Sequence, residues 1–452
     1  MSRKIVIIGH GPAGMAAAGF ASRTDRMANI TVLNAGEQDI YHPCALPFTI
    51  GGKLNVGDII EKAHYQKISL LNNTRVTTIN TQKKNVTAVN KEDQELIFEY
   101  DVLLIATGSE PFIPKRFIKG WDKEGVCMLK TPQDAQKIIK YAKTAKKTVV
   151  IGGSGIGIEV ASELVHTGKN TTLIELMPTL MPGRLESDMS QTVQTLLEAE
   201  GVTVRVNQGA KEITGQTKAE NVIAGDKEFP ADLVIMATGV TPNTELAKAI
   251  GLEIGEITRG IKTNLRMETS IPGIYAAGDC VETINLITKS PMPMWLAGIA
   301  TRQGRVAGIN LAGGSELFPG ALAAWIVVAH TFSVGGAGLT IDQAKKEGFD
   351  VVSSKLTPLL RPHYISTAKI TVLLIADRVT GQLVGGQVIG KERVAAMVNY
   401  IVLAITGGLT VRELTKVDWC YAPGANECVN PLARVAEALL VRIKALKRRI
   451  VL

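Results

Sequence analysis

The chain has 452 residues, which is enough for two or three domains. Of these residues, 46% are hydrophobic and 20% are charged. This composition excludes a disordered or fibrous protein, and the net charge of +8 suits an ordinary solvated surface. Because no aromatic residues interleave with the one basic cluster, the C-terminal "VRIKALKRRIVL", nucleic-acid binding is not expected. No apolar run reaches about 18 residues, so a membrane span is not expected either. Five scattered cysteines and no secretory signal before Ile5 indicate the reducing cytoplasm.

The first predicted element is a buried strand over residues 5–8 that runs into a glycine-rich turn and an Ala-rich helix. Glycine permits the tight turn, the close approach of backbone to a pyrophosphate, and helix–strand packing. A second strand ends at Asn34, whose amide is able to hydrogen-bond a ribose hydroxyl. The order strand, turn, helix and strand predicts a dinucleotide-binding unit. Its turn consists of Gly9, Gly11, Pro12 and Gly14.

A single cysteine, Cys44, follows in "IYHPCALPFTIGG", and the nearest other cysteine is Cys127. The thiolate is the reactive form of cysteine, so a catalytic Cys44 needs a group that stabilises it. If the segment is extended, His42 faces the same side as Cys44 and is able to stabilise the thiolate or protonate a leaving thiol. The alternative is a structural His42 that packs or binds a backbone carbonyl.

The glycine motif recurs after a predicted strand over residues 148–151. Ser154 stands where a second glycine is usual, and it is small enough to permit close approach. The following strand ends at Glu175, a carboxylate that is able to accept hydrogen bonds from ribose hydroxyls and would repel a 2′-phosphate. No arginine follows before Arg184, so NADH is preferred over NADPH. The turn consists of Gly152, Ser154 and Gly157.

Three more predicted strands end in small residues. Two carry Ala-Thr-Gly, which includes Thr107 and Gly108 in the first copy and Gly239 in the second. The third ends in Gly278 and Asp279, where a carboxylate is well placed to hold a polyol or ribose hydroxyl.

With these motifs, the chain resembles the pyridine nucleotide-disulfide oxidoreductases, a family of FAD and NAD(P)H enzymes, over essentially its whole length. The resemblance implies an α/β fold with two Rossmann-like nucleotide-binding domains, one for FAD and one for NAD, and a C-terminal α+β dimerisation domain. The FAD domain would comprise residues 1–110 and 246–320, the NAD domain 111–245, and the dimerisation domain 321–452. In this family pattern Gly9, Gly11, Gly14 and Asp279 match the FAD site, and Gly152, Gly157, Glu159 and Glu175 match the NAD site.

The segment "CALPFTIGG" resembles the single-cysteine branch of the family, because Thr49 stands where the other branch completes a Cys-x4-Cys pair. "DWCYAPGANECVNPL" resembles the segment that reaches the partner subunit's active site. The resemblance therefore implies a homodimer with Tyr421 and Tyr364 near Cys44 across the interface.

Several residues depart from the family pattern. Asn34 replaces a glutamate, which predicts weaker FAD binding. Pro12 replaces the catalytic histidine of oxidase and peroxidase members, with His10 two residues earlier, which disfavours direct reduction of oxygen or peroxide. Ile40 and Pro43 replace the Ser and Asn of coenzyme A-disulfide reductases. Gly155 replaces an aromatic residue and predicts an open nicotinamide pocket.

These features predict an FAD-dependent NADH:disulfide oxidoreductase, with Cys44 as its redox-active centre and a low-molecular-weight disulfide or polysulfide, such as coenzyme A disulfide, as acceptor. The alternatives are an NADH oxidase or peroxidase, and an NADH-oxidising electron-transfer subunit that serves a redox partner protein. Cys420 and Cys428 flank Tyr421 either as an auxiliary thiol pair or as structural cysteines, and their spacing fits no common metal site.

Overall fold

The computed structural model describes residues 2–450. The chain forms two compact units, each built from several separate segments. The first unit comprises Met1–Leu46, Leu54–Phe112 and Val240–Ala323. The second comprises Pro47–Lys53, Ile113–Gly239 and Ala324–Leu452. The segment that follows Cys44 therefore belongs to a different unit from Cys44 itself.

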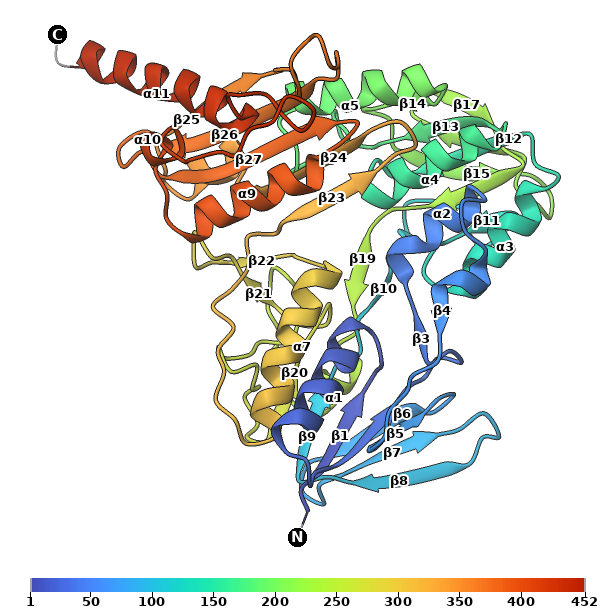
Figure 1. Cartoon of the computed structure of the whole chain (residues 1–452). Helices are drawn as coiled ribbons and strands as arrows, with labels where there is room; N and C mark the ends of the chain where they lie inside the picture. The colour runs from blue at the N-terminus through green and yellow to red at the C-terminus, as the bar shows by residue number, and fades with distance from the viewer. Residues whose placement is uncertain (1, 451–452) are drawn as a thin grey trace. The chain divides into compact units, whose positions relative to one another are not determined.

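A five-stranded parallel sheet forms the core of the first unit, in the order β20-β9-β1-β2-β5 (Figure 1). Its central strands β1 and β9 are almost wholly apolar and buried, as expected of parallel strands covered on both faces, whereas the edge strand β5 is only partly buried. The sheet comprises β1 (Lys4–Ile8), β2 (Asn29–Leu33), β5 (Ile68–Leu71), β9 (Val102–Ile105) and β20 (Ile274–Ala276).

Two helices, α1 (Pro12–Thr24) and α7 (Ala297–Leu311), lie side by side against this sheet (Figure 1). A Cβ atom at Gly304 would collide with the carbonyl of Ala13, and one at Gly308 with the carbonyl of Ala17. The two glycines of α7 therefore let the helix backbones approach closely, which fixes the position of the first turn of α1.

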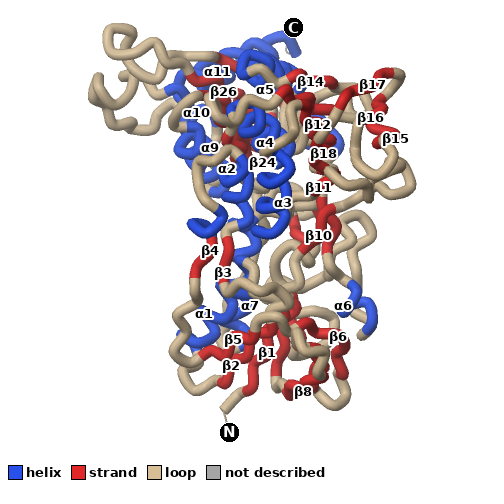
Figure 2. Tube along the Cα trace, turned by 90° about the vertical axis from the view of Figure 1, so that its right-hand side faces the viewer, coloured by secondary structure: helices blue, strands red, loops and turns tan. Residues whose placement is uncertain are grey.

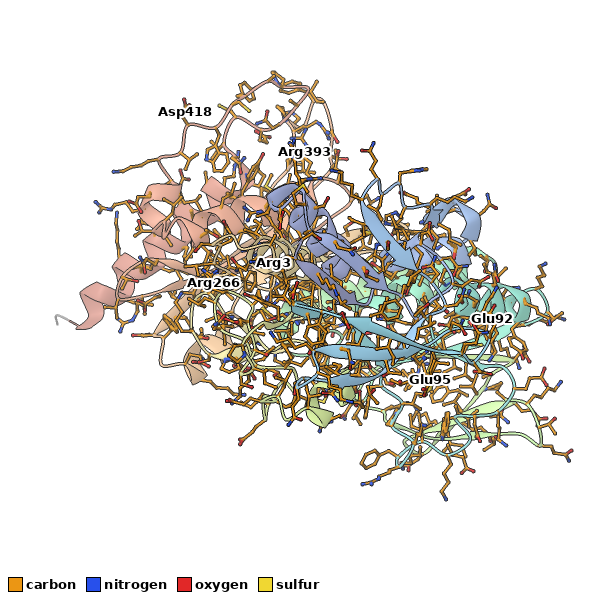
Figure 3. The ribbon with its side chains drawn as sticks, turned by 90° about the horizontal axis from the view of Figure 1, so that it is seen from below. Arg3, Glu92, Glu95, Arg266, Arg393 and Asp418 are labelled. Carbon is orange, nitrogen blue, oxygen red and sulfur yellow. The ribbon has the colours of Figure 1, made fainter. Side chains whose placement is uncertain are left out.

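Small antiparallel sheets of two or three strands complete the first unit. The largest is the ladder β6-β7-β8, whose β7–β8 end carries Glu92 and Glu95 (Figure 3). The ladder consists of β6 (Arg75–Asn80), β7 (Asn85–Val89) and β8 (Glu95–Glu99); the two-stranded pairs are β3 (Ile40–Tyr41) with β4 (Ile60–Glu61), β10 (Ser109–Pro111) with β19 (Val240–Pro242), and β21 (Thr283–Ile284) with β22 (Pro291–Met292). Short helical segments lie at η2 (Val56–Ile59) and α6 (Glu245–Ala249).

Two arginines donate hydrogen bonds to backbone carbonyls at and after the C-terminal end of α7. Arg3 donates to the carbonyl of Leu311 at 2.8 Å, and Arg266 donates to the carbonyl of Gly314 at 2.9 Å. Figure 3 shows the two arginines in the same part of the first unit. Together they hold the C-terminal end of α7 against β1 and the loop before β20.

The second unit begins with another five-stranded parallel sheet, in the order β11-β18-β12-β13-β14. Figure 2 shows α4 beside this sheet. Its strands are β11 (Val126–Cys127), β12 (Lys147–Ile151), β13 (Asn170–Ile174), β14 (Thr203–Arg205) and β18 (Leu233–Met236). Its helices are α3 (Pro132–Ala142), α4 (Gly155–His166) and α5 (Ser187–Glu200). A separate antiparallel ladder consists of β15 (Ala210–Thr214), β16 (Asn221–Ala224) and β17 (Lys227–Pro230).

The second unit ends in an antiparallel sheet in the order β23-β24-β27-β26-β25, with α9 packed on one face (Figure 1). Its central strand β27 is buried along its whole length. The strands are β23 (Trp325–Val328), β24 (Ser333–Gly338), β25 (Val351–Leu356), β26 (Ile370–Asp377) and β27 (Leu383–Gly390). The helices are α8 (Ile341–Lys346), α9 (Val394–Thr406), α10 (Val411–Leu414) and α11 (Pro431–Ile450).

Two parallel Rossmann-like cores and a C-terminal α+β sheet confirm the predicted fold class. Among the helices of residues 2–450, none combines the length and apolar character that crossing a bilayer requires.

Candidate functional site

The first glycine turn lies between β1 and α1 in the first unit. Gly9 has a φ of +101°, and a side chain there or at Gly14 would collide with backbone carbonyls. Gly11 is the N-cap of α1, and a Cβ there would meet no atom within 4 Å. Pro12, at the first helical position, costs no hydrogen bond. The turn thus leaves open space beside the N-terminus of a 13-residue helix, which suits a pyrophosphate.

Asp279 lies beside this turn. Gly278 has a φ of +90°, and a Cβ there would lie 2.9 Å from the Cβ of Ala13, in the first turn of α1. The carboxylate of Asp279 accepts a hydrogen bond from Ser109 Oγ at 3.0 Å. The structure therefore brings Asp279, predicted to hold FAD, next to the glycine turn predicted for the same cofactor.

The Ala-Thr-Gly residues Thr107 and Gly108 lie between β9 and β10 in the first unit. Thr107 Oγ1 donates to the carbonyl of Asn243 at 2.7 Å, and Asn243 donates back to the Thr107 carbonyl at 3.0 Å. Gly108 has a φ of +68° with open space at its Cβ position. This exchange joins the end of β9 to the residue that follows β19, and the carbonyl of Gly108 also accepts the N–H of Asn243 at 2.9 Å.

Asn34, at the end of β2, uses its amide within the protein. Its Nδ2 donates to the carbonyl of Gln38 at 2.9 Å and to Asn72 Oδ1 at 2.7 Å, and its Oδ1 accepts the N–H of Gly36 at 3.1 Å. Both amide hydrogens are therefore engaged, so a ribose hydroxyl would have to donate to the Oδ1 atom.

His10, inside the glycine turn, is buried and has both ring nitrogens engaged. Its Nδ1 lies 2.5 Å from the carbonyl oxygen of Asp39, and its Nε2 lies 2.9 Å from the hydroxyl of Tyr65. Burial lowers the pKa of His10, and Asp39 opposes this only in part. The ring holds the loop in place.

Cys44 lies in a helical turn over Pro43–Ala45, followed by α2 (Leu46–Ile50), and it is exposed. The chain turns at Pro43, so the extended segment that would place residues 42 and 44 on one side is absent. His42 instead precedes the turn, and its Nε2 lies 3.0 Å from Glu61 Oε1 on the paired strand β4. Sequence analysis missed Glu61, because only the pairing of β3 with β4 brings it beside His42.

The second glycine turn, between β12 and α4 in the second unit, repeats the geometry of the first. Gly152 has a φ of +113°, and side chains at Gly152 or Gly157 would collide with backbone carbonyls. Ser154 caps α4: its Oγ donates to the carbonyl of Ala237 at 3.1 Å and accepts the N–H of Gly157 at 3.4 Å. Because the serine side chain turns inward, the turn still offers its backbone to a phosphate.

Glu175, at the end of β13, is buried and ties two backbone segments together. Its Oε2 accepts the N–H of Gly153 at 2.6 Å, and its Oε1 accepts the N–H of Met177 at 2.7 Å. Each oxygen retains acceptor capacity for a ribose hydroxyl. Gly239, after β18, has a φ of +103° and open space at its Cβ position.

Glu159 projects from α4 toward the hairpin formed by β23 and β24. Its Oε1 accepts the N–H of Val328 at 3.0 Å, and burial raises the pKa of its carboxyl to about 7, with a smaller contribution from Glu163. A Cβ at Gly155 would lie 2.8 Å from a methyl group of Val327. Val327 of β23 therefore leaves no room for a side chain at Gly155, and the openness of the nicotinamide pocket stays a prediction.

One turn after Glu159, α4 carries a second buried carboxylate that sequence analysis missed. Glu163 pairs with Lys53, which ends the segment Pro47–Lys53. A Cβ at Gly51 would collide with this carboxylate, so the glycine is required where the segment crosses α4. No local pattern predicted the pair, because its members lie in distant parts of the sequence.

Tyr421 and Tyr364 lie within hydrogen-bond reach of each other in the second unit. A hydrogen bond to Tyr364 raises the pKa of Tyr421. Both side chains are exposed, Tyr364 by 66% and Tyr421 by 46%. Cys420 and Cys428, in the same loop, are also exposed. Within residues 2–450, no group of three or more His, Cys, Asp or Glu side chains is arranged to hold a metal ion.

Comparison with known proteins shows which family the chain matches. Residues 3–296 match the family described as pyridine nucleotide-disulphide oxidoreductase, and residues 325–433 match the dimerisation domain of that family. An NADH oxidase of Methanocaldococcus jannaschii is 35% identical over 448 residues, which cover 97% of this chain and 99% of that protein.

Two further relatives have names that refer to sulfur chemistry. A CoA-dependent NAD(P)H sulfur oxidoreductase of Pyrococcus furiosus is 33% identical over 451 residues, which cover 98% of this chain and 99% of that protein. The structure of an NAD-dependent persulfide reductase from A. fulgidus superimposes with a TM-score of 0.94 at 34% identity, covering 98% of this chain and 84% of that one. The similarity therefore extends over nearly the whole chain.

Proposed function

Because this chain belongs to the pyridine nucleotide-disulphide oxidoreductase family, we propose that it reduces a low-molecular-weight disulfide or polysulfide through the single thiol of Cys44. It is a flavin-dependent NAD(P)H oxidoreductase with FAD and NADH as cofactors. The observation that carries the proposal is the exposed Cys44 in its turn, with no second cysteine in the segment that follows. The names of the Pyrococcus furiosus and A. fulgidus relatives support sulfur as the electron acceptor.

The two glycine turns fit the two dinucleotides. Gly9, Gly11, Gly14 and Asp279 would hold FAD, and Gly152, Gly157, Glu159 and Glu175 would hold NADH. When bound, the two cofactors supply the pair of electrons that reduces sulfur. The inward-turned Ser154 and the unobstructed Gly11 support close approach of phosphates at both places.

Cys44 would act as the nucleophile. Its thiolate attacks one sulfur of the substrate, a new S–S bond forms to Cys44, and the other substrate sulfur leaves as a thiolate. With two electrons supplied by bound FAD and NADH, cleavage of the mixed disulfide would release the remaining substrate sulfur as a second thiolate and restore the Cys44 thiolate. The absence of a neighbouring cysteine means that the substrate's own sulfur completes the redox pair.

Substitution of the cysteine tests this function. Cys44→Ser should abolish NADH-dependent reduction of coenzyme A disulfide and of polysulfide, while FAD stays bound. Cys127→Ala serves as the control, because Cys127 is a buried thiol outside both glycine turns and outside the Cys44 segment. Full turnover by Cys44→Ser would rule out the mechanism.

Anaerobic reductive titration tests the same proposal without a substrate. Uptake of four electrons per FAD, with a long-wavelength charge-transfer band, would reveal a redox-active sulfur beside the flavin. Mass analysis of Cys44 before reduction would identify its adduct. Uptake of only two electrons by the wild-type protein would count against a redox-active Cys44.

NADH oxidation by oxygen is the second candidate, because the Methanocaldococcus jannaschii relative is named an NADH oxidase. Pro12 stands where oxidase members carry a histidine, and the ring nitrogens of His10 are both engaged, which count against it. Stoichiometric consumption of oxygen with NADH, unaffected by added disulfide, would favour the oxidase.

The proposal includes an arrangement of domains and subunits. We assign FAD to residues 1–110 and 246–320, NADH to 111–245, and dimer formation to 321–452. The match of residues 325–433 to a dimerisation domain supports a homodimer, with the exposed Tyr421 and Tyr364 acting at the partner's Cys44.

A further inference from the structure

Three side chains of the first unit form a hydrogen-bond chain that ends at the carboxylate of Asp39. Asn34 Nδ2 donates to Asn72 Oδ1 at 2.7 Å, and Asn72 Nδ2 donates in turn to Asp39 Oδ1. The other carboxylate oxygen, Oδ2, accepts the N–H of Ala63 at 3.0 Å. The hydrogen-bond chain therefore begins at Asn34 and terminates at a group that only accepts.

The first member of the hydrogen-bond chain lies beside the first glycine turn. The N–H of Gly9 donates to the carbonyl of Leu33 at 2.9 Å, and Asn34 is the next residue. On the other side, β2 pairs in parallel with β5, with Leu33 opposite Leu71, so Asn34 and Asn72 both follow paired residues. In a dinucleotide-binding unit, the side chain at the end of the second strand binds the adenosine ribose. The hydrogen-bond chain thus begins where the ribose of FAD would lie.

The carboxylate determines the direction of both hydrogen bonds. Because an ionised carboxylate has no proton to donate, Asn72 must present its Nδ2 to Asp39 and its Oδ1 to Asn34. The backbone imposes the same orientation on Asn34, since the carbonyl of Gln38 accepts from Nδ2 at 2.9 Å and the N–H of Gly36 donates to Oδ1 at 3.1 Å. An amide oxygen has two acceptor sites, so Asn34 Oδ1 retains one for a ribose hydroxyl.

A hydrogen-bond chain that ends at a negative charge strengthens the acceptor at its start. Hydrogen bonds in series polarise one another in the same direction, and the effect grows where the local dielectric is low. Asn34, Asn72 and Asp39 are all half-buried, which reduces screening by water. The charge of Asp39 therefore makes Asn34 Oδ1 a stronger acceptor than an isolated amide oxygen.

The histidine that contacts Asp39 does not cancel this charge. His10 Nδ1 lies 2.5 Å from the backbone carbonyl oxygen of Asp39, and its Nε2 lies 2.9 Å from the hydroxyl of Tyr65. Burial lowers the pKa of His10, so its ring is neutral at pH 7 and above. The same contact joins Asp39 to the glycine turn, because His10 lies between Gly9 and Gly11.

We infer that Asp39 is a positioning residue for FAD, which orients and polarises Asn34, through Asn72, toward the adenosine ribose. Asp39 thereby supplies the charge that Asn34 lacks and offsets part of the loss of FAD affinity that the sequence predicts for an asparagine at this position. The inference rests on the assignment of FAD to the first glycine turn in the proposed function, and it is independent of the electron acceptor.

The first test measures the Kd of FAD for the apoprotein by flavin fluorescence. Asp39→Asn removes the charge at nearly constant size and should raise the Kd at least about fivefold. Glu37→Gln removes a charge at an exposed position two residues earlier and should change the Kd less than about twofold. Equal effects of the two variants would assign the loss to net charge and overturn the inference.

Moving the charge separates this role from a merely structural one. Asn34→Glu places a carboxylate at the ribose itself, so the double variant Asn34→Glu, Asp39→Asn should bind FAD with a Kd within about twofold of the wild type. The double variant Asn34→Gln, Asp39→Asn has the same side-chain length without the charge and should remain weak. Recovery in both double variants, or in neither, would contradict a role for the charge.

The second test uses an FAD analogue whose adenosine ribose lacks both hydroxyls. The wild type should bind the analogue at least about tenfold more weakly than FAD, and in Asp39→Asn this ratio of Kd values should fall to less than about half. Asn72→Ala, which interrupts the hydrogen-bond chain but keeps the carboxylate, should lower the ratio likewise. A wild type without preference for the hydroxyls, or an unchanged ratio in either variant, would refute the role of Asp39.

These measurements use FAD and its analogue alone, so they decide the role of Asp39 whether or not the protein reduces a disulfide. A wild-type protein that binds FAD and discriminates against the analogue, but reduces no disulfide or polysulfide, would contradict the proposed function and leave this inference supported.

Discussion

The carboxyl group of Glu159 accepts the backbone N–H of Val328 at 3.0 Å, which joins the helix after the second glycine turn to the hairpin of the C-terminal sheet. The carboxyl is half-buried, and this burial raises its pKa to about 7. The joint between these two parts of the second unit therefore takes up a proton near neutral pH.

Glu159 makes the stability of the second unit depend on pH. Its folded pKa lies above the unfolded value, so the native state binds the extra proton and the free energy of unfolding falls as pH rises from about 4.5 to 7. The loss is about 3 kcal/mol at most. Glu159→Gln keeps an acceptor for Val328 and should remove this slope in urea unfolding at pH 5 and pH 8. Glu198→Gln, at an exposed position of α5, should keep the slope; a slope that survives in Glu159→Gln would assign it to another group.

The preference for NADH over NADPH should depend on the charge of the side chains at the end of β13. Glu175 disfavours a 2′-phosphate, and Leu176 beside it is 67% exposed. The double variant Glu175→Gln, Leu176→Arg should shift the ratio of kcat/KM for NADPH over NADH upward by at least about tenfold, because a repulsion is removed and a cation added. Leu176→Gln is the matched control and should leave the ratio near that of the wild type. An unchanged ratio in the double variant would place the determinant elsewhere.

FAD retention should depend on Asp279 far more than on its neighbour Ser109. Ser109 only donates to the carboxylate at 3.0 Å, whereas Asp279 is proposed to hold the cofactor itself. Asp279→Ala should weaken FAD binding by about 1.5–3 kcal/mol, the range of hydrogen bonds to charged groups, and Ser109→Ala by less than about 1.5 kcal/mol. Flavin release followed by fluorescence measures both. Similar losses in the two variants would indicate that Asp279 acts through Ser109.

Helix packing in the first unit should tolerate no side chain at Gly304. A methyl group there would collide with the carbonyl of Ala13, so Gly304→Ala should cost about 1–3 kcal/mol of unfolding free energy and weaken FAD retention. Gly298→Ala, on the same helix but with nothing within 4 Å of its Cβ position, is the control and should be neutral or slightly stabilising. Equal stability of the two variants would contradict the close packing of α1 on α7.

Hybrid dimers test whether Tyr421 acts across the subunit interface. Tyr421→Phe removes the hydroxyl that bonds Tyr364 and should lower disulfide turnover at least about tenfold with FAD still bound. A hybrid of one Tyr421→Phe subunit and one Cys44→Ser subunit regains one site with both groups intact, so it should recover up to half of the wild-type activity. A hybrid as inactive as its parents would place Tyr421 in the same subunit as the cysteine that it serves.

Local features of the sequence were enough to determine the two nucleotide-binding turns. In each turn the strand, the glycines and the helix follow one another directly, and glycine is required by a positive φ at Gly9 and Gly152 and by collisions at Gly14 and Gly157. Because neighbouring backbone sets the requirement for glycine at these positions, the requirement can be predicted from the sequence motif. The lack of a second cysteine in the segment that directly follows Cys44 is equally a property of the sequence alone.

Only the tertiary structure decided which side chains contact one another across distant parts of the chain. His42 pairs with Glu61, Glu163 pairs with Lys53 and faces His330, and Val327 covers Gly155. These partners lie far apart along the chain and follow no repeating spacing. They meet because strand pairing and helix packing bring distant segments together, and these contacts then fix the positions of the groups.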